Sequence, residues 1–337
     1  MPSSGKAYDY LAGQYETPLH IAVLETPAGF QPNTQCVAEN IGDYLKKHLQ
    51  NQQPQARIIP ARKRGTDFSP DDADILAPML DADWLFMGPG SPTYAVEQLR
   101  GSLAYESLRA LHLRGSAMCL ASAAVLAVSA WTLPVYEIYK VGSDPFWTKG
   151  LDLLGNFGLN VTFIPHWNNQ DGGAELDTSR CYMGRERFAG LQNRLAELDA
   201  HTCLVGIDEQ TALLVEFSAE PACRVFGKGS VTIQHDSLEA TFKHGHTFPL
   251  SLLGKFSMAS AAESLPQALW DAVEAARAAQ APQAEVIPEA LMDLAARRET
   301  ARKAADWALA DQLRAEIEAL GWQVLDSPDG PLLSRPS

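Results

Sequence analysis

Short apolar runs alternate with helix-like segments through the first half of the chain, and this alternation constrains the fold more than any other feature. Residues 20–24 form an apolar run, and residues 33–49 follow with apolar side chains at four-residue steps. Further apolar runs at 57–60, 84–87 and 117–121 are separated by helical stretches. This pattern is typical of parallel strands joined by crossover helices. We predict an α/β domain with a doubly wound, mostly parallel sheet.

The pattern changes after about residue 160. Residues 161–164 predict a strand and residues 188–198 a helix, after which several shorter apolar runs follow one another closely. We expect these later strands to add an antiparallel edge or hairpin to the sheet; they are residues 203–207, 212–217, 223–226 and 230–234. Earlier in the chain, Ser69 followed by Pro70 predicts the N-cap and first residue of a helix.

The C-terminal end is expected to form a separate module. Residues 280–286 have the composition of a linker, so we place the main α/β domain at 1–279 and a small module at 287–337. Before the linker, Ser264-Leu265-Pro266 is expected to open a helix that runs through residue 279. Within the module, residues 287–303 and 306–320 predict a helical hairpin. Gly321 stands where a glycine commonly ends a helix.

Charge and cysteine usage narrow the class of protein. The net charge of −14 disfavours non-specific binding to nucleic acid or to an anionic membrane, because the long-range field has the wrong sign. The five cysteines form no Cys-x-x-Cys pair, which argues against a zinc ribbon or a disulfide framework. With no apolar signal core at the N-terminus, we expect a cytoplasmic protein with no membrane contact.

The strongest chemical signal is Ser122. It follows the apolar run that ends at Ala121 and precedes a stretch that looks helical, which is the setting of a nucleophile elbow. That turn exposes the serine hydroxyl and directs a helix N-terminus at a developing oxyanion. The usual pattern is Gly-x-Ser-x-Gly, and here Leu120 and Ala124 replace both glycines. A small-residue helix that only packs on the sheet is the structural alternative.

Cys119 is a second candidate nucleophile. It lies within Ala-Met-Cys-Leu-Ala, which mimics an elbow with alanines in place of the glycines. Cysteine is intrinsically the better nucleophile, but a cysteine in a buried strand commonly serves as a small apolar residue. We therefore favour Ser122 and keep Cys119 as the alternative.

His166 is the expected base for a serine nucleophile. It follows the strand at 161–164, at an edge where the functional loops of open α/β sheets gather. Glu137 and the pair Asp208–Glu209 supply carboxylates that can orient its ring. The alternative is a structural histidine that bonds to the backbone.

Glycines and arginines complete the expected site. Gly88 and Gly90 follow the strand at 84–87, and with the amide of Ala123 they can build an oxyanion hole. Three arginines follow His166 and can hold a substrate carboxylate, although surface ion pairs explain them about as well: Arg180, Arg185 and Arg187. His244 and His246 are expected to share a face of an extended strand, but no acid or cysteine stands near them. We therefore expect no metal site and no cofactor.

Together these residues resemble the serine peptidases of family S51, the group of aspartyl dipeptidase and cyanophycinase, within the class I glutamine amidotransferase-like fold. Residues 86–94 are similar to the glycine-rich strand end of that family, and Ser122-Ala123 falls where its Gly-Thr-Ser-Ala-Gly-Ala nucleophile motif lies. Residues 206–212 (Gly-Ile-Asp-Glu-Gln-Thr-Ala) are similar to another strand of the family, and the similarity covers residues 18–260.

The resemblance implies a hydrolase in which Ser122 attacks and His166 is the general base. For the third residue of the triad it leaves two acids, Glu137 and Glu209. We favour Glu137, because its separation from Ser122 is close to that of the acid in the dipeptidase. In the wider fold the nucleophile is a cysteine, which keeps Cys119 as a candidate.

The C-terminal module resembles the C-terminal end of cysteinyl-tRNA synthetase, through residues 296–314 and on to Gly330. No catalytic or zinc-binding part of the synthetase is present, so aminoacylation is not implied. From Glu285 onward there are ten acidic and six basic residues. A solvated helix face therefore explains the basic residues better than a tRNA contact does; they are Arg297, Arg298, Arg302 and Lys303.

The sequence thus predicts a serine peptidase or amide hydrolase, of the dipeptidase type, that acts on a small peptide or amide substrate through an acyl-enzyme. Two alternatives stay open: an inactive or weakly active binding and regulatory protein, and a cysteine-dependent amidotransferase-type enzyme. A homodimer is also left open. The sequence does not specify the substrate.

Overall fold

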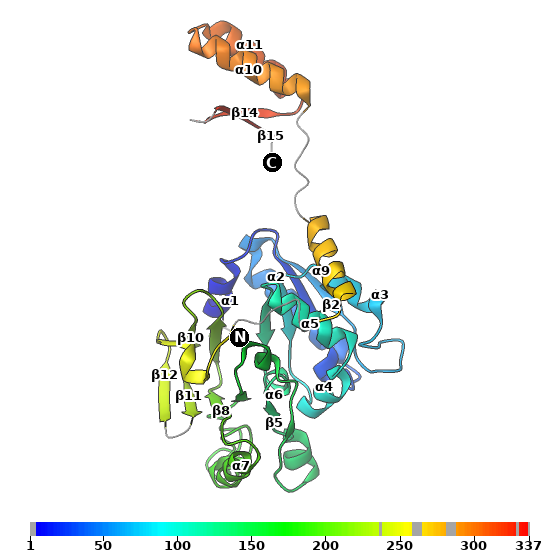
Figure 1. The fold of residues 1–337 in the computed structure, drawn as a ribbon, viewed down its shortest axis with the longest axis vertical. Coiled ribbons are helices and arrows are strands. Elements are labelled where there is room, and N and C mark those ends of the chain that lie inside the picture. The colour runs from blue at the N-terminus through cyan, green and yellow to red at the C-terminus, as the bar shows by residue number, and fades with distance from the viewer. Residues whose placement is uncertain (1–4, 236–237, 258–264, 281–287, 328–329, 336–337) are drawn as a thin grey trace. The chain divides into compact units, whose positions relative to one another are not determined.

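The computed structural model describes residues 5–235, 238–257, 265–280, 288–327 and 330–335. Its contacts divide the chain into two compact units, Met1–Ala279 and Gln280–Ser337. Each unit has its own apolar core. Figure 1 labels the helices and strands of both units. Among the described residues, no helix is both long and apolar enough to cross a bilayer. The predicted linker and the expected helix start at Ser264 lie outside the described residues.

The first unit begins with a wholly parallel four-stranded sheet. Its order is β2 (Gln55–Ile59), β1 (His20–Leu24), β3 (Trp84–Met87) and β4 (Ala117–Leu120). Leu24 lies opposite Met87, and Met87 lies opposite Leu120, so the carboxyl ends of the three strands are aligned. The turn at Gly88 and the turn at Ser122 therefore leave the sheet at the same edge.

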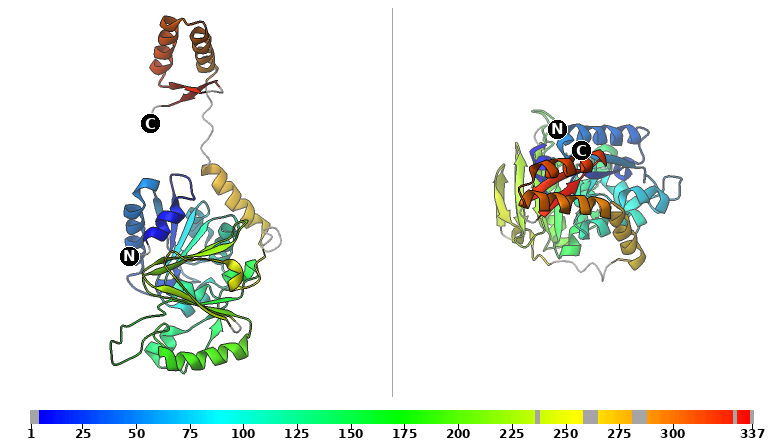
Figure 2. Two further views of the ribbon diagram at one scale, coloured as in Figure 1. Left: turned by 90° about the vertical axis from the view of Figure 1, so that its left-hand side faces the viewer. Right: turned by 90° about the horizontal axis from the view of Figure 1, so that it is seen from above.

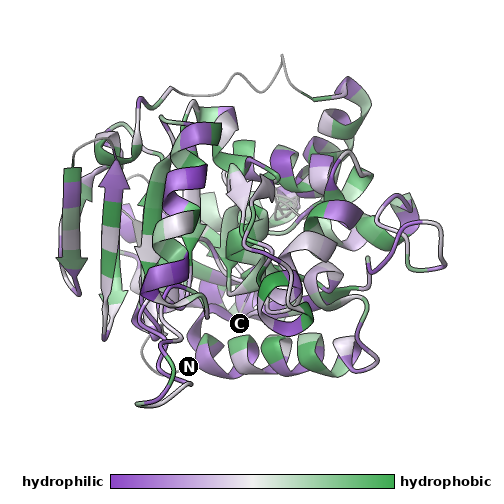
Figure 3. Cartoon of the chain, turned by 90° about the horizontal axis from the view of Figure 1, so that it is seen from below, coloured by the Kyte–Doolittle hydropathy of each residue, from purple (hydrophilic) through white to green (hydrophobic). Residues whose placement is uncertain are grey.

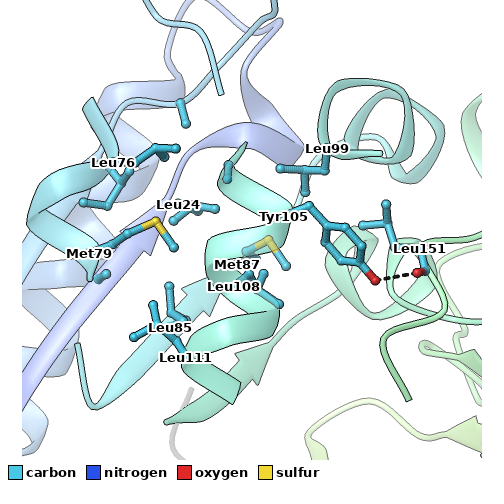
Figure 4. Close-up of a cluster of buried hydrophobic side chains, with 14 of the residues drawn as sticks. Leu24, Leu76, Met79, Leu85, Met87, Leu99, Tyr105, Leu108, Leu111 and Leu151 are labelled. Carbon is cyan, nitrogen blue, oxygen red and sulfur yellow. Dashed lines mark hydrogen bonds between the residues drawn. The ribbon is translucent and has the colours of Figure 1, made fainter. Parts of the chain in front are cut away.

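Alternate side chains of β1 point to opposite faces of this sheet, as the strand period requires. Ala22 and Leu24 enter a core with side chains of α4 and α5, among them Leu99 and Leu108 (Figure 4). Ile21 and Val23 enter another core with side chains of α1 and α2. Helices therefore cover both faces, and the predicted doubly wound α/β fold is confirmed. The helices of this unit are α1 Gly5–Ala12, α2 Thr34–His48, α3 Ala73–Leu76, α4 Pro92–Leu99, α5 Leu103–Leu113, α6 Ala123–Ala127, α7 Gly184–Leu198 and α9 Gln267–Gln280.

The strands after residue 160 form a second sheet and an antiparallel layer. The second sheet has the order β12 (Leu238–Lys243), β11 (Ser230–His235), β8 (Cys203–Ile207) and β7 (Val161–Ile164). Only β7 and β8 are parallel in it; the other two pairs are antiparallel. A three-stranded antiparallel sheet is made of β13 (Thr247–Pro249), β10 (Ala222–Gly227) and β9 (Thr211–Glu216). Two short strands also pair antiparallel, β5 (Trp131–Thr132) and β6 (Thr148–Lys149).

The helix α6 and the residues after it connect the two four-stranded sheets. The backbone N–H of Ala130 donates to the carbonyl of Val161 at 2.8 Å, and the N–H of Phe163 donates to Ser129 Oγ at 2.9 Å. Ser129 is 1% exposed, so these bonds are shielded from water. They fix β7, in the second sheet, relative to the helix that leaves β4, in the first.

Two local expectations are wrong. The helix expected at Ser69 begins at Ala73, because Asp72 is its N-cap and accepts hydrogen bonds from the N–H groups of Asp74 and Ile75. Ser69 instead accepts from the N–H of Asp71 in the preceding turn. His244 and His246 do not share a strand, because they lie in the connection between β12 and β13.

The second unit contains a helical hairpin and a strand pair. Its helices are α10 (Glu289–Lys303) and α11 (Trp307–Ala319), and β14 (Gln323–Ser327) pairs antiparallel with β15 (Gly330–Ser334) (Figure 2). The hairpin agrees with the sequence, whereas β15 was not predicted. Gly321, with φ +80°, ends α11 as expected.

The basic residues of α10 have local partners. Arg297 lies 3.8 Å from Asp293, and Lys303 lies 3.2 Å from Glu299, each one helical turn away. Arg298 is 3% exposed, and the Arg302 guanidinium lies over the Trp307 ring. Arg297 and Lys303 are therefore each paired with an acid of their own helix, while Arg298 is buried.

Helices at the surface of the protein carry both hydrophilic and hydrophobic residues, as Figure 3 shows.

Replacement of Leu108 by alanine tests the core beneath the first sheet. Leu108 is 0% exposed among side chains of the sheet and of α4, so its loss leaves a cavity. We expect the free energy of unfolding to fall by about 2–5 kcal/mol, measured by urea denaturation with tryptophan fluorescence. Leu198→Ala, at a side chain that is 53% exposed, is the matched control and should change it by less than about 0.5 kcal/mol. Equal losses in the two variants would contradict this assignment of the core.

Candidate active site

Ser122 stands in a strained turn between β4 and α6. Its backbone has φ 53° and ψ −116°, a conformation that non-glycine residues rarely adopt. Such strain is kept only where the surroundings fix it, and it is the known geometry of a nucleophile elbow. The turn forms although Leu120 and Ala124 stand where glycines are usual.

Small side chains explain why the turn forms without glycine. Ala124 and Ala127 are 0% and 1% exposed and lie in the core beside Ala95 of α4. The helix α6 therefore approaches α4 closely, and a methyl group fits where a larger side chain would not. Leu120 is only partly buried and packs at the border of the same core.

His166 faces Ser122 from the second sheet. It follows β7, has φ 54°, and its Nε2 lies 3.1 Å from Ser122 Oγ. The His166 side chain is 29% exposed, so the pair lies at the protein surface and a substrate can reach it. This distance is within the range of a nucleophile and its base.

Glu209 completes a chain of three side chains. It follows β8, the parallel neighbour of β7, and Ile164 lies opposite Gly206 in that pair. The loops after the two strands therefore meet, and His166 Nδ1 lies 3.0 Å from Glu209 Oε1. A carboxylate there selects the tautomer in which Nδ1 carries the proton and Nε2 can accept the proton of the serine.

The preference for Glu137 as the partner of His166 is not supported by the geometry. Its Oε1 accepts a hydrogen bond from Thr93 Oγ1 at 2.5 Å, at the N-terminal turn of α4. The carboxylate is therefore held by the helix that follows Gly90 and not by the histidine. Its Oε2 is shielded from solvent, with no hydrogen-bond partner among the described residues.

The expected oxyanion donors stand on elements that neighbour the Ser122 turn. Gly88 and Gly90 follow β3, the strand that pairs with β4, and Ala123 is the first residue of α6. In the described part of the chain, no hydrogen bond engages the N–H of Gly90 or Ala123. Gly90 has φ +154°, and a Cβ there would lie 1.8 Å from the carbonyl oxygen of Pro27. This position therefore requires glycine.

A left-handed turn supports the loop that carries His166. Arg180, Cys181 and Tyr182 have φ values of 58°, 58° and 69° in succession. The N–H of Arg180 donates to the carbonyl of Trp167 at 2.9 Å, and the N–H of Cys181 donates to that of His166 at 3.1 Å. Three consecutive residues in this region carry considerable strain. The turn therefore fixes the backbone of His166 from the outside.

The three arginines have different surroundings. Arg180 and Arg185 line a cavity of about 600 Å³ that also reaches Asn169, the neighbour of the His166–Glu209 pair. The Arg180 guanidinium stacks on Trp167 and donates to its carbonyl, and its burial lowers the pKa of this group. Arg185 lies 3.3 Å from Asp177. Arg187 donates to the carbonyls of Met183 and Tyr182, so it stabilises its own turn and does not line the cavity.

Two asparagines contact Glu209 and were not singled out from the sequence. Asn169 Nδ2 donates to Glu209 Oε1 at 2.7 Å, and Asn168 Oδ1 accepts from the N–H of Glu209 at 2.8 Å. Both stand just after Trp167, the residue that follows His166. No local pattern marks them, because their partner is about forty positions away and meets them only through the pairing of β7 with β8.

Cys119 has no access to this site. It is 7% exposed and packs with Leu19 and Phe86 on the face of the sheet covered by α1 and α2. Burial raises the pKa of its thiol to about 12. The nucleophilic thiolate is therefore disfavoured there. Within the described ranges, no group of histidine, cysteine and acidic side chains is arranged to hold a metal ion.

Comparison with solved structures defines the class of fold. A peptidase from an acI-B1 actinobacterium aligns with a TM-score of 0.56 over 74% of this chain and 92% of its own, at 19% identity. A putative peptidase E protein from Listeria monocytogenes EGD-e aligns over 72% of this chain with a TM-score of 0.41 and 11% identity. The first alignment shows that the chain has the fold of that peptidase. No protein-family model matches the chain.

The similarity to curated proteins is confined to short stretches. The cysteine–tRNA ligase of Chlamydia pneumoniae is 58% identical over 45 residues, which are 13% of this chain and 10% of the ligase. That of Phenylobacterium zucineum (strain HLK1) is 48% identical over 59 residues, 15% of this chain and 13% of the ligase. The chain therefore spans only about a tenth of the length of the curated relatives it matches, and it is similar to them in one short segment.

Alkylation in the native state tests the burial of Cys119. At pH 8 a thiol with a pKa of about 12 is ionised to a fraction on the order of 10⁻⁴. Of the five cysteines only Cys36 is exposed, so we expect iodoacetamide to modify Cys36 alone, with all five modified after denaturation. Peptide mass spectrometry identifies the sites, and Cys36→Ala is the control. Rapid native modification of Cys119 would contradict the assigned burial.

Proposed function

We propose that the chain is a serine hydrolase that cleaves a peptide or amide bond in a small substrate. The observation that carries this proposal is the 3.1 Å separation of Ser122 Oγ and His166 Nε2, with Ser122 on a strained strand-to-helix turn. The contact of Glu209 with His166 Nδ1 supports it further. So does the fold, since a protein with this fold is described as a peptidase.

In this proposal His166 accepts the proton of Ser122 as Oγ attacks the carbonyl carbon of the substrate. The tetrahedral intermediate places its oxyanion at the N-terminus of α6, where the N–H groups of Ala123 and Gly90 donate to it. Glu209 stabilises the imidazolium that forms.

The intermediate then collapses, and His166 gives the proton to the leaving amine as the carbon–nitrogen bond breaks. Water attacks the resulting ester of Ser122, with His166 again as the base. This step releases the carboxylic acid and restores the serine hydroxyl.

A substrate with a carboxylate beside the scissile bond fits this proposal best. Arg180 and Arg185 both line the cavity next to Asn169, whereas few apolar side chains do. Guanidinium groups bind carboxylates through paired, charge-assisted hydrogen bonds. Arg185 is the more accessible of the two, because its side chain is 79% exposed, and a substrate carboxylate there would compete with its ion pair to Asp177.

Labelling with a fluorophosphonate probe tests the nucleophile. We expect labelling of the wild type and of Cys119→Ala, and none of Ser122→Ala. His166→Ala should lower the labelling rate by about 10³-fold or more, because the serine loses its base. Glu209→Gln should lower it more than Glu137→Gln does, since only Glu209 contacts the ring.

The alternatives give opposite results in the same experiment. Labelling that survives Ser122→Ala and vanishes in Cys119→Ala would favour the cysteine-dependent enzyme. A folded wild type that is neither labelled nor able to hydrolyse any peptide of a dipeptide panel would favour the binding and regulatory protein.

Arg185→Ala tests the carboxylate subsite. We expect the ratio of kcat/KM for dipeptides with an N-terminal Asp to those with Asn to fall by about 10-fold, because a charge-assisted contact is lost. Arg187→Ala is the matched control, since Arg187 bonds to its own backbone and lies outside the cavity. An unchanged ratio in Arg185→Ala would exclude it from this subsite.

A further inference from the structure

We infer that Asn169 is a positioning residue that fixes the carboxylate of Glu209 against His166; this inference rests on the proposed function. Asn169 Nδ2 donates to Glu209 Oε1 at 2.7 Å, and His166 Nδ1 approaches the same oxygen at 3.0 Å. Glu209 Oε1 thus lies between two donors from one loop, and Asn169 and His166 together set the position of this oxygen.

Glu209 needs such a partner because of its surroundings. Its side chain is 37% exposed and borders a cavity of about 270 Å³ that Lys228 also lines. An exposed glutamate has three side-chain torsions, and it can turn toward water or toward Lys228. In the triad of other serine hydrolases the acid is buried and packing holds it in place. Here a hydrogen bond must do so.

Asn169 itself is held firmly, so it can hold another group. It is 2% exposed. Its Oδ1 accepts from the N–H of Asp171 at 3.1 Å, and its own N–H donates to the carbonyl of His166 at 3.2 Å. The first of these bonds also sets which end of the amide faces Glu209, because only the NH₂ group can donate to the carboxylate.

Asn168 fixes the backbone of the same glutamate. Its Oδ1 accepts from the N–H of Glu209 at 2.8 Å. The two asparagines therefore hold Glu209 at its backbone and at its carboxylate, and both lie in the loop that begins with His166. They connect the loop after β7 with the turn after β8. Glu209 is thus tied to the same loop that carries His166.

The rate constant for fluorophosphonate labelling of Ser122, measured from pH 5 to 9 in the full chain, tests this role. Asn169→Ala should lower it by about 10- to 100-fold, as loss of a hydrogen bond to a charged group does. Asn169→Asp should lower it at least as much at pH 8, because two carboxylates then face each other.

The pH profile separates positioning from structural damage. The carboxyl group introduced by Asn169→Asp regains a proton to donate as the pH falls, so the ratio of variant to wild type should rise toward pH 5. Damage to the fold would leave this ratio flat. Asn193→Asp, the same change at an exposed position of α7, should match the wild type throughout.

A double-mutant comparison completes the test. In a Glu209→Gln background, Asn169→Ala should change the rate by less than about twofold, because the group through which it acts is already lost. A flat pH ratio, or full additivity of the two substitutions, would overturn the inference while Ser122 labelling of the wild type still supports the proposed function. Absence of Ser122 labelling in the wild type would overturn both.

Discussion

The contact between Ser122 and His166 depends on how two separate sheets are fixed to each other. Ser122 lies in the turn after β4 of the first sheet, and His166 follows β7 of the second. The connection between them is the segment after α6, where the N–H of Ala130 donates to Val161 and the Ser129 hydroxyl accepts from the N–H of Phe163. These bonds are buried, so water does not compete for them. A shift of β7 by one residue would turn the His166 side chain away from Ser122.

The loops at this edge are held by backbone strain and by hydrogen bonds in combination. Ser122, His166 and Gln210, the neighbour of Glu209, all have positive φ values, as do three consecutive residues at 180–182. Each such residue costs free energy of about 1–3 kcal/mol. The packing of α6 and the bonds of the asparagines to Glu209 offset that cost. The site is therefore rigid where the proposed chemistry requires a fixed geometry, at the serine hydroxyl and the imidazole ring.

Much of the fold could be predicted from local pattern alone. The strands at 20–24, 84–87 and 161–164 have the expected bounds, because continuous apolar runs are the signature of buried strands. The helix expected at Ser69 begins later, since Asp72 competes as the N-cap and has two N–H partners. The connection at 244–246 was misjudged, because alternation of side chains alone does not separate a strand from the turn between two strands.

The sequence by itself determined the class of fold and the candidates for the site. The periodicity of apolar residues indicates the class of fold. Ser122 and His166 are candidates because they follow predicted strands, and side chains at strand ends of an α/β sheet can meet a substrate. Only the tertiary structure decided which acid faces His166. Spacing along the chain favoured Glu137, but the parallel pairing of β7 with β8 brings Glu209 to the ring while Thr93 holds Glu137. The contacts of Asn168 and Asn169 with Glu209 could not be predicted for the same reason. Contacts between loops far apart in the chain follow from strand pairing and leave no local pattern in the sequence.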